Sequence, residues 1–211
     1  NDTFRHRVGG YLLCSVFSSG FASARYKVPP KVREAQEYSL IAANNVLRRE
    51  VFEGVGGFDP KQALSEENDL YFRMKQKGYK LLFVPDVFVW HRAKPIWRPL
   101  VQKVFFYAAG RGILMLRKPG SFRLVYLLPV LFAVGLLLSP LFLLVPFARF
   151  LFAAGAVGYG FLNMLNAMAI ARKGERDIRA LLAVCIATPM LLFTYGLGIL
   201  YGFYLYWRGD I

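Results

Sequence analysis

The sequence predicts an α/β cytoplasmic part followed by an all-α membrane region of three transmembrane helices. Three observations support this division. Long uncharged apolar runs fill the carboxyl-terminal part, 21 of the 27 basic residues precede residue 124, and short β-rich runs alternate with helical runs before that point. An apolar composition of 56% excludes a disordered chain, and two cysteines in 211 residues exclude a disulfide-stapled mini-protein.

The expected membrane region, residues 124–211, contains three apolar runs without a charged side chain. They cover residues 124–145, 150–171 and 180–206. Each run exceeds the roughly 20 residues that a helix needs to cross a bilayer. Buried helices of a soluble bundle are the alternative, but such helices carry a polar stripe that these runs lack.

The distribution of basic residues predicts the orientation in the membrane. The connector after the second run carries four cations, whereas the connector before it carries one: Arg172, Lys173, Arg176 and Arg179 against Arg149. By the positive-inside rule, the second connector and residues 1–123 face the cytoplasm and the carboxyl terminus lies outside. We therefore expect a multi-pass protein of the inner (plasma) membrane.

Residues 1–95 show the alternation typical of an α/β domain. Glycines and Ser65 mark the expected ends of helices, because glycine tolerates positive φ and serine caps helix starts. The predicted helices are 6–24, 49–55 (ending at Gly56 and Gly57) and 66–77 (stopped by Gly78), and the predicted strands are 38–42, 79–84 and 87–90.

Residues 96–123 predict a basic amphipathic segment at the membrane interface. Between residues 92 and 123 there are eight basic residues and no acid, and apolar side chains such as Ile96 and Ile113 are interleaved with them. Cations of this kind bind anionic lipid head groups, and with aromatic residues they also suit nucleic acid. Because the segment leads directly into an apolar run, we expect a membrane with anionic lipids as partner and no nucleic acid.

Three acids crowd the start of the predicted helix 66–77. Ionised carboxylates are stabilised there by the helix dipole, so ordinary helix-end chemistry is one explanation of Glu66, Glu67 and Asp69. Because successive side chains diverge by about 100°, Glu66 and Asp69 share one face while Glu67 points elsewhere. One carboxylate can therefore face a cleft while the others bind the scaffold.

The order of several short motifs resembles the carboxyl-terminal half of a family 2 glycosyltransferase with the GT-A fold. It is similar to the bacterial membrane-anchored, exopolysaccharide-type enzymes of the cell envelope. The segments that carry the resemblance are Ala-Ala-Asn-Asn-Val-Leu-Arg-Arg (42–49), Gly-Gly-Phe-Asp (56–59), Glu-Glu-Asn-Asp-Leu-Tyr-Phe-Arg (66–73), Gly-Tyr (78–79), Val-Trp-His (89–91) and Gly-Arg-Gly (110–112).

The resemblance implies roles for individual residues. The second acid of the family's Glu-Asp pair is the catalytic base, which here falls on Glu67, with Glu66 and Asp69 as its catalytic companions. The strand-end histidine that approaches metal and diphosphate in some members falls on His91. The positions implied for substrate binding are Asn44, Asn45, Gly57, Arg73 and Arg111. Asn44, Asn45 and Gly57 equally suit turn and strand-end hydrogen bonding.

The implied reaction transfers a sugar, with inversion, from a nucleotide-sugar donor to a lipid-linked or saccharide acceptor. The family's Gln-x-x-Arg-Trp motif of processive enzymes is absent after Gln102, and Glu replaces Asp at position 67. The Asp-x-Asp motif that holds Mg²⁺ or Mn²⁺ and the donor-binding half are expected upstream of Asn1.

A truncated, non-catalytic membrane anchor or scaffold is the alternative to an enzyme, and a basic RNA-binding membrane protein is a further alternative. If the acceptor is a lipid phosphate, its oxygen is already anionic and needs no base.

Overall fold

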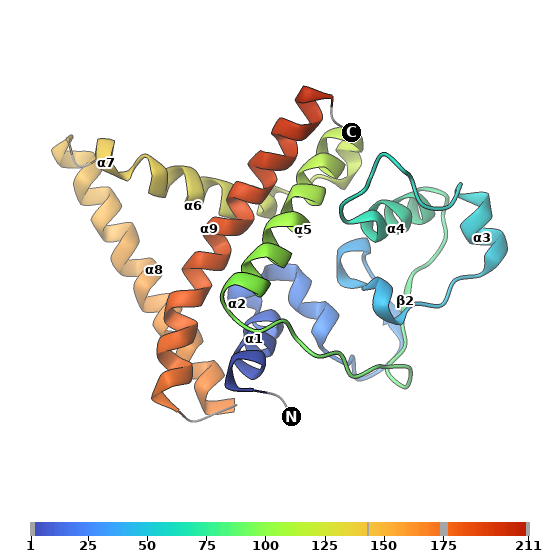
Figure 1. Ribbon diagram of the computed structural model, residues 1–211, viewed down its shortest axis with the longest axis horizontal. Helices are drawn as coiled ribbons and strands as arrows, with labels where there is room; N and C mark the ends of the chain where they lie inside the picture. The colour runs from blue at the N-terminus through green and yellow to red at the C-terminus, as the bar shows by residue number, and fades with distance from the viewer. Residues whose placement is uncertain (1–2, 143, 174–176, 210–211) are drawn as a thin grey trace.

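A computed structural model describes residues 3–142, 144–173 and 177–209 (Figure 1). Two long helices, α5 (Arg98–Arg117) and α9 (Ile178–Arg208), run side by side through the centre of the molecule. Figure 1 shows α6–α8 on one side of this pair and α3, α4 and β2 on the other. The other elements are α1 (Phe4–Cys14), α2 (Val16–Ser19), η1 (Gly20–Tyr26), β1 (Arg33–Glu34), η2 (Glu37–Ser39), η3 (Ala42–Asn44), α3 (Arg49–Gly54), α4 (Glu66–Gln76), β2 (Leu82–Phe83), η4 (Pro119–Ser121), η5 (Leu124–Tyr126), α6 (Leu127–Leu137), α7 (Ser139–Phe142) and α8 (Pro146–Lys173).

The predicted α/β character of residues 1–95 is not confirmed. Within the described ranges the only sheet pairs β1 with β2, antiparallel, with Arg33 opposite Phe83 and Glu34 opposite Leu82. The run 38–42 forms parts of two 3₁₀ turns, and 87–90 is irregular. A strand needs a neighbouring strand for its backbone N–H and C=O groups, whereas backbone groups of these two runs bond to side chains and turns, such as the Tyr38 carbonyl to Arg25 and the Val87 carbonyl to Asn44.

The helices predicted from local signals are confirmed around α3 and α4. Gly56 (φ +83°) and Gly78 (φ +81°) follow these helices in the left-handed conformation that the sequence predicts. The expected helix 6–24 is instead divided into α1, α2 and η1. Ser15 interrupts it in an extended conformation, and its hydroxyl caps α2 by accepting a hydrogen bond from the backbone N–H of Ser18.

Two helices are long and apolar enough to cross a membrane, Pro146–Arg172 and Ile178–Arg208. The first predicted span, 124–145, does not form one such helix in the described part of the chain. α6 has 11 residues, which is about 16 Å of helix and well short of a bilayer core. The Ser139 hydroxyl donates to the carbonyl of Leu136 (2.7 Å), and Pro140 has no N–H to continue the helix. By contrast, α9 continues through Pro189.

Glycines allow α5 and α9 to approach closely. A Cβ at Gly198 would lie 2.5 Å from the carbonyl oxygen of Phe105, and one at Gly202 would overlap that of Ala109. Small residues spaced in this way let two helix backbones pack in a membrane-type interface. Ile96 and Ile113, expected at the lipid boundary, are instead 3% and 0% exposed, because they pack inside the protein.

An ion pair joins the loop before α4 to the end of α5. Nη2 of Arg117 donates to Oδ2 of Asp59 (2.6 Å), and both side chains are largely buried. Partial burial alone would raise the pKa of Asp59, but hydrogen bonds from the Lys61 backbone and from Arg117 outweigh it and lower this pKa.

Protonating Asp59 is therefore expected to weaken this contact. Because the folded-state pKa is lowered, the stabilisation is present above the ordinary value of 3.8 and is lost as pH falls through the folded-state value. We expect Asp59→Asn to cost about 1 kcal/mol at pH 7 and progressively less below pH 3.8. Thermal unfolding of both proteins across this range measures the difference, and a gap that does not change with pH contradicts the prediction.

Candidate active site

The start of α4 is fixed by contacts with α5. Ser65 was expected to cap α4, but it has a φ of +57° and makes no capping hydrogen bond; its hydroxyl donates instead to the backbone oxygen of Tyr107 (3.0 Å). Nε2 of the buried Gln62 donates to the carbonyls of Leu64 (2.7 Å) and Gly110 (3.0 Å). A side chain at Gly110 would collide with Leu64, so the Gly-Arg-Gly segment permits this docking.

The three acids at this helix start have three different environments. Glu66 is exposed, and Asp69 is completely buried. Glu67 lies between these extremes, with 11% of its side chain exposed. Glu66 and Asp69, which were expected to share one face, therefore differ most in burial, and Glu67 is closer to Asp69 than to Glu66 in this respect.

Asp69 belongs to a structural clamp and not to an open site. Nε of Arg73 donates to its Oδ2 (2.7 Å), and the same guanidinium donates to the carbonyls of Val55 and Gly57, the latter at 2.6 Å. These bonds hold the turn after α3 against α4. Oδ1 of Asp69 is buried without a hydrogen-bond partner among the described residues. The catalytic role of Asp69 and the substrate-binding roles of Arg73 and Gly57 stay predictions, and in this conformation these groups bind one another through Oδ2 of Asp69 and the carbonyl of Gly57.

A buried amide, Asn68, organises the surroundings of Glu67. Its Nδ2 donates to Oε1 of Glu67 (3.1 Å) and to the hydroxyl of Tyr107 (2.8 Å). Its Oδ1 accepts from Nη2 of Arg25 and Nη2 of Arg111, both at 2.8 Å. Nη1 of Arg25 lies 3.6 Å from Oε1 of Glu67, which is an ion pair without a close hydrogen bond.

Arg111 is enclosed by the protein and cannot meet a substrate in this conformation. It is 1% exposed, and its guanidinium lies 5.0 Å from the ring centre of Tyr126. Its bond to Asn68 instead supports the residue that positions Glu67. The substrate-binding role of Arg111 stays a prediction, and the contact present in this conformation is the one to Asn68.

Cations and phenols surround the Glu67 carboxylate. Burial and the charge of Arg25 lower the pKa of Lys103, whereas Glu67 acts in the opposite direction. Burial, followed by the negative charge of Glu67, raises the pKa of Tyr71 to about 12, and both effects also raise the pKa of Tyr26. The charges of Arg25 and Glu67 thus both act on Lys103, and Arg25 also forms an ion pair with Glu67.

The remaining predicted positions lie apart from this cluster. Nδ2 of Asn44 donates to the backbone of Val87 (3.1 Å), while Nδ2 of Asn45 donates to the hydroxyl of Tyr71 (2.8 Å). Only Asn45 therefore contacts the surroundings of Glu67. His91 does not end a strand: it is exposed in the irregular segment between β2 and α5.

No group of three or more His, Cys, Asp or Glu side chains within residues 3–142, 144–173 and 177–209 is arranged to hold a metal ion. The described residues therefore do not fit a divalent cation by themselves. Neither of two cavities, of 510 and 360 Å³, is lined by Glu67. In this conformation 11% of the Glu67 side chain is exposed, beside the guanidinium of Arg25.

Sequence reasoning missed three members of this cluster. Arg25 reaches Asn68 across 43 residues of sequence, and no local pattern predicts such a contact. Lys103 was one of several basic residues in the expected interfacial segment, although it lies on α5 facing Tyr26, with Nζ 5.8 Å from the ring centre. Asn68 had a usable signal, because it stands between two acids on the first turn of a helix.

Comparison with known proteins identifies the chain. The description "Glycosyl transferase family group 2" matches residues 37–201, which is most of the sequence. The chain is also 28% identical over 79 residues to the probable glycosyltransferase YdaM of Bacillus subtilis, covering 37% of this chain and 19% of that protein. It thus spans less than a fifth of that relative's length, and no solved structure matches. Since the family match covers most of the chain, including Glu67, Asn68, α5 and most of α9, the chain belongs to glycosyl transferase family group 2.

Proposed function

We propose that this protein is a membrane-bound glycosyltransferase that moves a sugar, with inversion, from a nucleotide-sugar donor to a lipid-linked or saccharide acceptor. Membership of the family supports a donor and an acceptor in general. The observation that carries the proposal is the placement of Glu67 at the first turn of α4, between Arg25 and the Asn68 amide.

Glu67 is the acid best suited to act as the base. Asp69 is held at 2.7 Å by Arg73, and Glu66 faces solvent away from the cluster's hydrogen bonds. The contacts of Glu67 are longer, 3.1 Å to Asn68 and 3.6 Å to Arg25, and its side chain keeps 11% exposure. A small movement therefore frees this carboxylate for an acceptor hydroxyl, as catalytic contacts often tighten only in the substrate complex.

The chemical step follows from these positions. The carboxylate of Glu67 takes the proton of the acceptor hydroxyl as its oxygen forms a bond to the anomeric carbon. The bond from that carbon to the diphosphate oxygen breaks on the opposite face, which inverts the configuration. Arg25 and Lys103 supply preorganised positive charge for the leaving diphosphate, and such charge is typically worth several kcal/mol. We propose Mg²⁺ or Mn²⁺ only with ligands outside the described residues, and no step here depends on it.

We also propose that the reaction takes place at the cytoplasmic face of the inner membrane. α8 and α9 are long and apolar enough to span it, and 21 of the 27 basic residues precede residue 124, in the part of the chain that carries Glu67. α5 connects the membrane helices to the region around Glu67. It packs on α9, and its Tyr107 and Arg111 side chains bond to Asn68.

The test is an assay of the full-length protein in nanodiscs containing anionic lipids. A panel of nucleotide-sugars is supplied with lipid-linked and oligosaccharide acceptors, with Mg²⁺, Mn²⁺ or a chelator. We expect acceptor-dependent release of nucleoside diphosphate and a product of inverted anomeric configuration by NMR. Folded protein that releases no nucleotide with any donor, or a product with retained configuration, would overturn the proposal.

A further inference from the structure

A cavity of about 360 Å³ lies between the α1–α2 junction and α8, apart from the Glu67 cluster. Val16 and Ala169 form part of its rim and are exposed, whereas Ile170 is buried against the core. The cavity falls within the size range of sites for small organic ligands. Because α8 is apolar enough to span a membrane, this rim faces the region where lipid chains are present.

One end of the cavity is polar. Ser15 donates to Oδ1 of Asn166 (2.6 Å), and Nδ2 of Asn166 donates to the hydroxyl of Ser18 (3.2 Å). These bonds join α2 to α8 and fix the polar wall. Lys27 also lines the cavity, and among the described residues no ion pair or side-chain hydrogen bond occupies its ammonium group.

The charge of this polar end is positive. Among the described residues no Asp or Glu lines the cavity, and the ammonium of Lys27 is the ionised side chain in its lining. Burial raises the pKa of the neighbouring Cys14 thiol, and the charge of Lys27 opposes this effect. An apolar cavity with one unpaired cation at its end is complementary to an amphiphile with an anionic head.

The cavity adjoins the proposed active site through one short segment. Cys14 donates from Sγ to the backbone oxygen of Tyr26 (3.5 Å), and Lys27 follows directly. The Tyr26 hydroxyl accepts a hydrogen bond from Lys103 (3.5 Å), and the negative charge of Glu67 contributes to raising the pKa of Tyr26. Residues 25–27 therefore connect the two places. Arg25 and Tyr26 contact side chains near Glu67, and Lys27 lines the cavity.

We propose that this cavity binds the phosphate and the first part of the hydrocarbon chain of a lipid-linked acceptor. Lys27 contacts the phosphate, while Val16, Ala169 and Ile170 contact the chain. Bound in this way, the lipid holds its sugar beside the segment that separates the cavity from Glu67. That the bound lipid is a sugar acceptor rests on the proposed function. Binding of the lipid in the cavity can be measured without it.

Cys14 provides a direct measure of occupancy, because its thiol lines the cavity. In full-length Cys185→Ser protein it is the only cysteine of residues 1–211. The rate of its alkylation by N-ethylmaleimide in maltoside micelles is measured with dodecyl phosphate, dodecanol or inorganic phosphate. We expect dodecyl phosphate to slow alkylation in a saturable manner, and the other two compounds to have little effect at equal concentration.

Two substitutions test the role of charge. Lys27→Gln is expected to weaken protection by dodecyl phosphate about tenfold, because one charge-assisted contact is lost. Lys31→Gln makes the same change at an exposed position outside the cavity and is expected to leave protection unchanged. Equal protection by inorganic phosphate, equal protection by dodecanol, or an unchanged Lys27→Gln protein would each overturn the proposal.

The outcome is separable from the proposed function. Protein with Glu67→Gln is expected to retain lipid protection of Cys14 while losing sugar transfer. Transfer without any lipid protection would remove the cavity proposal and leave the glycosyltransferase proposal intact. Lipid protection of Cys14 in a folded protein that transfers no sugar would leave the lipid-binding cavity intact and remove the glycosyltransferase proposal.

Discussion

Glu67→Gln is expected to lower sugar transfer to a hydroxyl acceptor by about 10²- to 10⁴-fold, the usual contribution of a positioned base. The amide keeps the size of the side chain but cannot accept the acceptor's proton. Its oxygen still accepts the hydrogen bond from Asn68, so the start of α4 is expected to stay folded. Steady-state kinetics in nanodiscs should show the loss in kcat, with a small change in KM for the donor.

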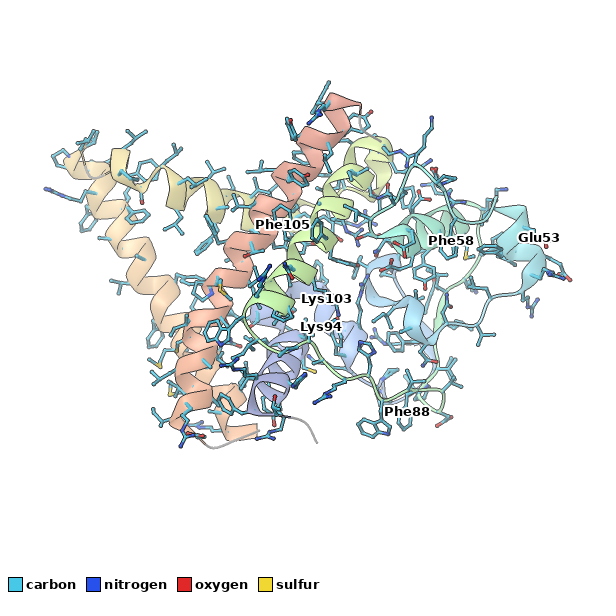
Figure 2. The ribbon with its side chains drawn as sticks, viewed as in Figure 1. Glu53, Phe58, Phe88, Lys94, Lys103 and Phe105 are labelled. Atoms are coloured by element: carbon cyan, nitrogen blue, oxygen red, sulfur yellow. The ribbon has the colours of Figure 1, made fainter. Side chains whose placement is uncertain are left out.

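A matched control for this substitution is Glu53→Gln on α3. Glu53 is exposed, forms only a surface ion pair with Arg49 (3.3 Å) and lies at the far edge of the molecule from Lys103 (Figure 2). We expect the sugar-transfer activity of the Glu53→Gln protein to lie within about twofold of that of the unmodified protein, because exposed ion pairs contribute little to stability. If Glu67→Gln turns over as fast as this control, Glu67 is not the base. If the Glu67→Gln protein still transfers sugar to a lipid phosphate but not to a hydroxyl acceptor, the phosphate oxygen reacts without a base.

Gly202→Leu is expected to destabilise the protein by about 3 kcal/mol or to prevent the pairing of α5 with α9. A Cβ at this position overlaps the carbonyl oxygen of Ala109, which is helix backbone and cannot move aside without shifting α5. Because α5 also carries Tyr107 and Arg111 to Asn68, we expect transfer activity to fall together with stability. The midpoint of thermal unfolding in detergent measures the first effect.

Gly155→Leu on α8 is the control for the glycine substitution. Nothing lies within 4 Å of a Cβ built there, so the same change meets open space on an apolar helix. We expect an unfolding midpoint close to that of the unmodified protein. Equal destabilisation by both substitutions would show that the cost comes from the leucine itself and not from the α5–α9 contact.

Much of the local structure was predictable from sequence because its causes are local. α3 and α4 close hydrogen bonds between residues four apart, and Gly56 and Gly78 stop them through a conformation that glycine adopts freely. The order of short motifs predicted the family, which the match over residues 37–201 confirms. Length and apolar composition likewise identified α8 and α9.

Contacts between distant segments decided the rest. The β-rich runs did not build the expected sheet, because a strand depends on partners elsewhere in the chain. The first apolar run, 124–145, was interrupted around Ser139 and Pro140. The sequence by itself determined that acids crowd the start of α4. Only the tertiary structure decided their environments. The carbonyls of Val55 and Gly57 hold Arg73 beside Asp69, whereas Arg25 and α5 enclose Glu67, so much of the desolvation and charge that distinguish the two carboxylates comes from groups remote in sequence.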